Sequence, residues 1–169
     1  MPLQAEGEFA RVKEKLEGSL VLSGQPVKRG TMAHMHIVYM MLVDTAAKAR
    51  DAETIRKYAP LLEELAKRDQ HQPYLAISQR GKGTAHRLGL EFEQAELCLN
   101  QALEIFESLG MRWQAGRTLF ELGELAMQTG LHSLSEERFA SALENFEELK
   151  AAPDVERTAA ALAEIRALE

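Results

Sequence analysis

The chain has 169 residues, 46% of them hydrophobic, so it is long enough to bury a core without disulfides or metals. Its net charge of −6 argues against a general nucleic-acid-binding protein, because that function needs an excess of lysine and arginine to neutralise phosphates. The single cysteine, Cys98, excludes an internal disulfide and favours a reducing compartment.

The predicted elements, taken in chain order, are all helices. Hydrophobic residues recur at helical spacing from Phe9 onward, and no stretch alternates as a half-buried strand would. Residues 23–30 and 69–73 are rich in residues that break helices, and Asp51 stands where it can cap the next helix. The predicted helices cover approximately residues 9–20, 31–48, 51–67, 74–88, 91–109, 112–128, 134–150 and 154–168. We therefore expect an all-α fold.

No targeting or membrane segment is predicted. The N-terminal sequence contains acidic residues and lacks the apolar core of a signal peptide. The most apolar run, from His36 to Val43, is roughly half as long as a bilayer-spanning helix. We therefore expect a cytoplasmic protein with neither a membrane nor a nucleic acid as its partner.

The sequence contains an internal repeat with a spacing of 40 residues. The residues that match at this spacing are Gly83 with Gly123, Ala95 with Ser135, Ala102 with Ala142, and Phe106 with Phe146. A similar segment begins earlier, at Ala52. We therefore expect an α-solenoid of three stacked antiparallel helix pairs, at about residues 31–68, 73–110 and 112–150. Residues 1–30 form an N-terminal capping helix and loop in this interpretation, and residues 151–169 form a C-terminal capping helix.

The third pair resembles a tetratricopeptide repeat (TPR), which has Leu-Gly in its first helix, Gly at the turn, and a small residue, an aromatic residue and Ala in its second helix. The residues that carry this resemblance are Leu122, Gly123, Gly130, Ser135, Phe139 and Ala142. The second pair keeps Gly83, Ala95 and Ala102, but Leu90 stands where the turn glycine is expected.

The 40-residue period is similar to that of the long-helix TPR arrays at the ends of large bacterial signalling proteins, including cyclase-like and transcriptional-activator regulators. The resemblance covers roughly residues 31–168 and implies a TPR-like superhelix that binds other proteins.

The glycines near residue 82 raise the alternative of a phosphate-binding loop. A Walker-type loop needs a glycine five residues before its Gly-Lys pair and a Ser or Thr directly after it. Here Ala76 and Gly83 occupy those two positions, and no strand precedes them. We therefore interpret the segment as a helix in which Gly83 allows a neighbouring helix to approach closely, whereas Gly81 has no such partner in the repeat.

Other patterns that carry chemistry favour structural interpretations. His34 and His36 lie on different sides of a helix, which is wrong for a shared metal. The methionines at 32, 35, 40 and 41 are typical of an irregular core, and Trp113 is expected to pack against the preceding pair. No catalytic constellation can be assigned. We therefore predict no metal, no cofactor and no enzyme activity.

The candidate binding residues follow from the TPR resemblance, in which the first helix of each pair lines the concave side. The outward face of the second pair's first helix is then expected to carry Ile77 and the first three candidates below, and the corresponding face of the third pair's first helix the other three. The candidates are Arg80, Thr84, Arg87, Arg117, Glu121 and Glu124. Because guanidinium binds carboxylate through two parallel hydrogen bonds, the three arginines predict that the ligand is an acidic peptide or the C-terminus of another protein.

The leading functional hypothesis is a non-catalytic protein-interaction module, acting as the regulatory segment of a signalling system. One alternative is a small-molecule sensor, which needs an enclosed apolar pocket with a few polar groups. The other is a structural oligomerisation segment, which would form a homodimer through the apolar ends of the solenoid.

Overall fold

The fold is known from a computed structural model, which describes the backbone of residues 2–22 and 32–167 and the side chains of residues 8–20 and 35–167. Within these ranges the protein forms eight α-helices and no strand, which confirms the predicted all-α class. The helices are α1 (Pro2–Leu22), α2 (Met32–Lys48), α3 (Ala52–Arg68), α4 (Gln72–Leu88), α5 (Phe92–Ser108), α6 (Arg112–Gln128), α7 (His132–Glu148) and α8 (Ala152–Arg166). The predicted break at residues 23–30 lies outside the described residues.

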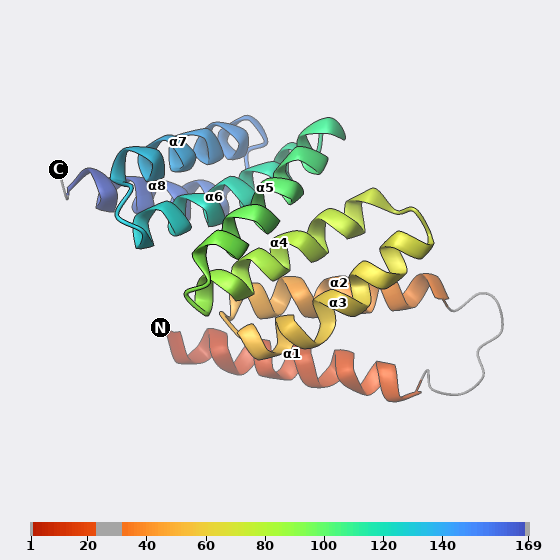
Figure 1. The fold of residues 1–169 in the computed structure, drawn as a ribbon. Coiled ribbons are helices and arrows are strands. Elements are labelled where there is room, and N and C mark those ends of the chain that lie inside the picture. The colour runs from red at the N-terminus through yellow and green to blue at the C-terminus, as the bar shows by residue number, and fades with distance from the viewer. Residues whose placement is uncertain (1, 23–31, 168–169) are drawn as a thin grey trace.

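The helices pack in the order in which they follow along the sequence, as in a solenoid (Figure 1). Helices α2 to α7 form three antiparallel pairs, with α1 against α2 at one end and α8 against α7 at the other. Helix α4 also contacts α2 and α6, so the first helices of successive pairs lie side by side. This arrangement places the side chains of α2, α4 and α6 close enough to interact.

The six turns between α2 and α8 share one backbone geometry. Each helix ends in a Schellman motif, in which the amide two residues past the C-cap donates to a carbonyl in the last helical turn, as Glu91 N donates to His86 O at 2.9 Å. The residue before that amide has a positive φ in every case. These residues are Arg50, Gln70, Leu90, Gly110, Gly130 and Lys150, spaced 20 residues apart. Leu90 has a φ of 60°, in the place where the next two turns have glycine.

The helix starts differ from the prediction by more than one residue in four places. Helix α1 begins seven residues earlier than expected, and α4, α7 and α8 each begin two residues earlier. Pro73 and Pro153 are predicted to precede their helices but lie within the first turn. Proline is tolerated there, since the amide it lacks would have no partner in the helix. The predicted cap is confirmed, since the Asp51 carboxylate accepts a hydrogen bond from Thr54 N at 3.0 Å.

Small residues of the repeat occupy the close contacts between helices. A Cβ added to Gly83 would lie 2.6 Å from the Leu99 side chain, and one added to Gly123 would lie 2.6 Å from the Phe139 ring. The repeat offers no partner for Gly81, but a Cβ added there would lie 2.4 Å from the Val43 side chain of the first pair.

The remaining repeat residues are buried in the same layers. Ala95, Ala102 and Ala142 are fully buried, and Leu122 is buried beside them. The buried Ser135 hydroxyl donates to the carbonyl of Gly123 at 2.9 Å, which joins α7 to α6. In the described part of the protein, no helix is long and apolar enough to cross a bilayer.

Candidate binding groove

Helices α2, α4, α6 and α8 together line a groove of about 360 Å³, named here the inner groove. Four helices reach it because the first helices of the pairs lie side by side and α8 continues their row. All six candidate residues predicted from the sequence line this groove. They are Arg80, Thr84 and Arg87 on α4 and Arg117, Glu121 and Glu124 on α6.

Two of the candidate arginines share one carboxylate from the first pair. Arg80 Nη2 donates to Asp44 Oδ1 at 2.9 Å, and Arg117 Nη1 donates to Asp44 Oδ2 at 2.9 Å. Arg80 also donates to the Gln114 side-chain oxygen at 2.6 Å. Burial raises the pKa of Asp44, but the two adjacent arginines lower it more, so the net shift is downward. Burial and the nearby Arg117 lower the pKa of Arg80 to about 10, which leaves it protonated at neutral pH.

The third candidate arginine is held by α6. Arg87 Nη2 donates to Glu121 at 2.8 Å and its Nη1 donates to Glu124 at 3.3 Å. Thr84 donates its hydroxyl to the same Glu121 oxygen at 3.2 Å, and Arg50 donates to Glu124 at 3.1 Å. Arg87 is only 2% exposed, and its Nε has no hydrogen-bond partner.

The expectation that this face of α4 points outward is wrong. Ile77, Arg80, Thr84 and Arg87 are all buried. The physical reason is that α2 and α6 pack on both sides of α4 and bring carboxylates against its arginines. The arginines are therefore neutralised within the protein, and a ligand would have to displace an existing ion pair to reach their paired nitrogens.

The cations that remain accessible in the groove are Lys48, Arg50 and Arg157. The Arg157 guanidinium lies 3.9 Å from the centre of the Phe120 ring, and its nearest carboxylate, on Asp154, is 3.8 Å away. Burial lowers the pKa of Arg157. With the paired acids Asp44 and Asp154 included, the described groove carries six basic and five acidic side chains. It therefore has one excess positive charge in a protein whose net charge is −6.

Sequence reasoning missed Asp44, Arg50 and Arg157. The repeat contained a signal for two of them, because Asp44 lies two 40-residue periods before Glu124, and Arg157 lies one period after Arg117. No such signal exists for Arg50, which reaches the groove from the turn between α2 and α3.

Trp113 is expected from the sequence to pack against the preceding pair, and this expectation is wrong. Its indole nitrogen donates to Asp154 of α8 at 2.9 Å, and the Arg117 guanidinium lies 4.8 Å from its ring. The side chain is partly exposed at the junction with the C-terminal helix. Trp113 therefore joins α6 to α8 beside the inner groove.

The histidines do not form a metal site among the described side chains, where no group of three ligating residues converges. His36 is buried, with its Nε2 3.0 Å from Asp69 and its ring stacked on Tyr74. The side chain of His34 lies outside the described residues.

The fold and the inner groove define a helical-repeat protein with a charged groove along the first helices of its pairs. A comparison with protein-family models finds no matching family, and a search of curated proteins finds no match.

Proposed function

We propose that the protein is a non-catalytic, TPR-type interaction module that binds an acidic segment or the C-terminus of a partner protein in the inner groove. The observation that carries this proposal is the local excess of positive charge in an otherwise acidic protein. A groove of one sign attracts ligands of the other, and its low-dielectric walls strengthen that field. In this proposal the module has a regulatory role in signalling.

The contacts with the ligand fall to the accessible cations. Arg50 is 64% exposed at its side chain and uses one of its five N–H donors on Glu124, which leaves donors for a carboxylate. Arg157 has only a long contact to Asp154 and stands over Phe120, where a bound segment would exclude water from the pair. The buried Arg80 and Arg117 contribute to the positive electrostatic potential of the groove and, through Asp44, hold its helices in place.

Fluorescence polarisation with labelled peptides tests this proposal. The probe is a pool of fluorescein-labelled hexapeptides with a free C-terminus and three acidic residues, and the matched pool has glutamine or asparagine in their place with an amidated end. We expect the acidic pool to bind at low salt and to weaken as salt rises. The double variant Arg50→Glu and Arg157→Glu should bind about 30-fold more weakly, equivalent to roughly 2 kcal/mol.

The matched control is Arg166→Glu, which reverses a charge on the same helix at a residue paired with Glu136 and outside the groove. This variant should bind like the wild type, and circular dichroism should show that all variants fold. Equal binding of the two peptide pools, or unchanged binding by the double variant, would contradict the proposal.

A small-molecule sensor is the second candidate, and two observations favour it. The groove volume of about 360 Å³ lies within the range of about 300 to 1,000 Å³ that is typical of ligand pockets. The buried Arg87 Nε is a donor without a protein partner. In this case a small dicarboxylate such as succinate should raise the melting temperature in proportion to the logarithm of its concentration, while the peptide pools fail to bind.

A further inference from the structure

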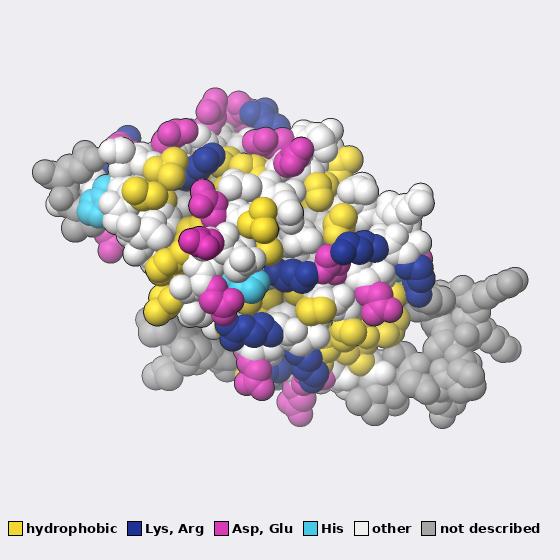
Figure 2. All heavy atoms as spheres, viewed as in Figure 1, with side chains coloured by type: hydrophobic (Ala, Val, Ile, Leu, Met, Phe, Trp, Pro, Cys, Tyr) yellow, Lys and Arg dark blue, Asp and Glu magenta, His cyan; other side chains and the backbone are white. Residues whose placement is uncertain are grey.

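A second hollow, of about 240 Å³, lies between α5, the end of α6 and the start of α7, and is named here the third-pair hollow. Its walls are mainly apolar and include Phe92, Leu125, Ala126 and Leu131. On the face shown in Figure 2, hydrophobic side chains reach the surface between acidic ones over α5 to α7. The rim carries Glu93 and Glu96 on α5 and Arg138 on α7. None of these three forms an ion pair among the described side chains.

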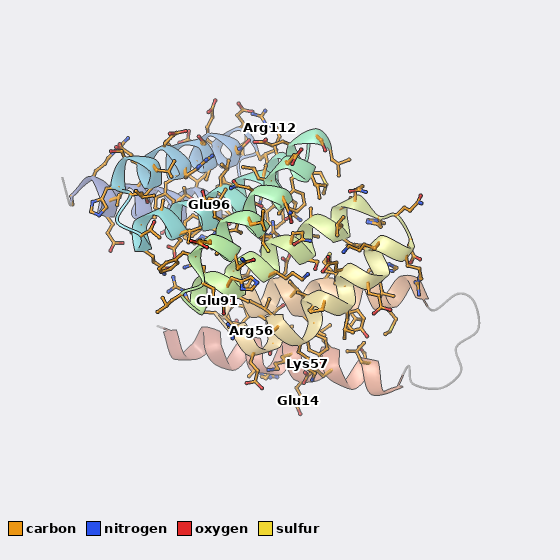
Figure 3. The ribbon with its side chains drawn as sticks, in the orientation of Figure 1. Glu14, Arg56, Lys57, Glu91, Glu96 and Arg112 are labelled. Atoms are coloured by element: carbon orange, nitrogen blue, oxygen red, sulfur yellow. The ribbon has the colours of Figure 1, made fainter. Side chains whose placement is uncertain are left out.

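The same place in the preceding pair, 40 residues earlier, is filled by the protein itself. Arg56 of α3 donates to the carbonyl of Ala85 at 3.3 Å and lies 3.6 Å from Glu91. His86 lies 2.7 Å from the same Glu91 carboxylate. Figure 3 shows Arg56 and Glu91 close together where α4 meets α5. A basic side chain with an apolar stem therefore occupies this position in the second pair.

The first pair keeps the ion pair but leaves a hollow of about 280 Å³ at the same place, beside Leu42 and Ala46. Lys13 of α1 donates to Asp51 Oδ2 at 3.0 Å, and Asp51 is the residue that starts α3 just as Glu91 starts α5. In both pairs, a basic side chain from the helix before the pair contacts the acidic residue that directly follows the turn between the pair's two helices. The pairing of a base with this acid thus recurs in the solenoid, whereas the place itself is open in the first pair and occupied by Arg56 in the second.

The third pair has lost both partners. Leu131 stands where the acid follows the turn, and Glu96 stands in the place of Arg56. Ala126 replaces His86, which removes a ring and opens the hollow. The hollow therefore lies where a basic side chain sits in the preceding pair, with the Glu96 carboxylate in place of that side chain and Glu93 beside it, where the preceding pair also has an acid, Glu53. Even with Arg138, the rim has an excess of negative charge.

We propose that the third-pair hollow docks an arginine or lysine side chain from a basic, partly apolar segment of a partner protein. The stem of that side chain packs on the apolar walls around Leu125, and its cationic head pairs with Glu93 or Glu96, because long basic side chains bury their stems and keep their heads near water. The site shares only α6 with the inner groove, since its other helices are α5 and α7, and its charge has the opposite sign. Its occupant is therefore separate from the acidic ligand proposed above.

An NMR titration of the ¹⁵N-labelled 169-residue chain tests this inference, with n-hexylguanidinium as the probe and hexanoate, of similar stem and opposite charge, as its match. We expect saturable shifts of the amides from Thr129 to Leu131 and around Glu96 with the guanidinium. Hexanoate should shift these amides only at about fivefold or greater concentration, since the two rim carboxylates repel it. A hexapeptide with alternating Leu and Arg should shift the same amides.

Two variants make the test specific. Glu96→Arg places a basic side chain in the hollow from within, as Arg56 does, and should abolish the shifts; Glu107→Arg, exposed on the same helix and outside the hollow, should leave them unchanged. The double variant Glu93→Gln and Glu96→Gln keeps the shape and should bring the two probes to equal affinity. Equal affinity of both probes for the wild type, or unchanged binding by Glu96→Arg, would overturn the inference without bearing on the acidic ligand.

Discussion

Replacing Asp44 by asparagine should destabilise the protein strongly, because this carboxylate is the shared partner of two buried arginines. Arg80 and Arg117 are 3% and 8% exposed, so neither can turn to water when Asp44 loses its charge. Removing one partner of a buried ion pair typically destabilises by about 3 to 5 kcal/mol. Asparagine keeps one acceptor oxygen at the same place, so we expect a value near the lower end, about 3 kcal/mol.

The assay is urea unfolding at neutral pH followed by circular dichroism, with thermal unfolding beside it. In a protein of this length about 3 kcal/mol corresponds to a fall in melting temperature of roughly 6 to 12 °C. The matched control is Glu148→Gln, which removes the charge from an exposed ion pair with Arg112 and should change the stability by less than about 1 kcal/mol. Equal effects of the two substitutions would refute the account of the inner groove as a buried ion-pair network.

The pH dependence of the wild type and Asp44→Asn gives a second readout. The pKa of Asp44 is lowered in the folded state, so its contribution to stability is fully present above the unfolded value of about 4. It decreases as the pH falls below about 4, because the unfolded state then binds a proton that the folded state does not, and it is fully lost once the pH has fallen through the lower, folded value. The difference in stability between the wild type and Asp44→Asn should therefore be constant from about pH 5 to 8 and should narrow below about pH 4. A difference that stays constant down to acid unfolding would contradict this assignment.

Two further predictions concern the repeat itself. Leu90→Gly should stabilise the protein by about 0.5 to 1 kcal/mol in urea unfolding, since Leu90 is exposed and has a φ of 60°. The control is Leu131→Gly, at a position of negative φ, which should give no gain in stability. Ala102→Leu and Ala142→Leu should each lower stability by about 1 to 3 kcal/mol through overpacking, and unchanged melting temperatures in both would contradict the proposed packing of the repeats.

The helices and their spacing could be predicted because both depend on local patterns. Apolar residues at helical spacing, the Asp51 cap and the matching of Gly83 with Gly123 all appear within a few turns of helix or at one fixed period. The predicted start of α4 is two residues late, because Pro73 resembles a helix break although proline also fits the first turn of a helix.

The chemistry of the inner groove could be predicted only in part. The repeat brought the six candidate residues to one place, and they do line one groove. Which acid pairs with which arginine could not be predicted in this way, because Arg117 and Asp44 are 73 residues apart and Arg87 and Glu121 are 34 apart, which is neither local nor a whole number of periods. Whether the array is of the TPR type, and what it binds, stays a prediction.

The uniform turns and the uneven groove have different consequences for how this array is assembled. Identical turns every 20 residues give each helix pair the same backbone, so the backbone alone would let the pairs be stacked in any order. The side chains do not, because the equivalent positions 44, 84 and 124 carry Asp, Thr and Glu. Asp44 of the first pair forms ion pairs with Arg80 of the second pair and Arg117 of the third. Both carboxylates that pair with Arg87 come from α6. If two helix pairs were exchanged or one were duplicated, the backbone would still stack, but buried arginines would face a threonine or another arginine in place of a carboxylate. The charged side chains therefore fix the order of the helix pairs.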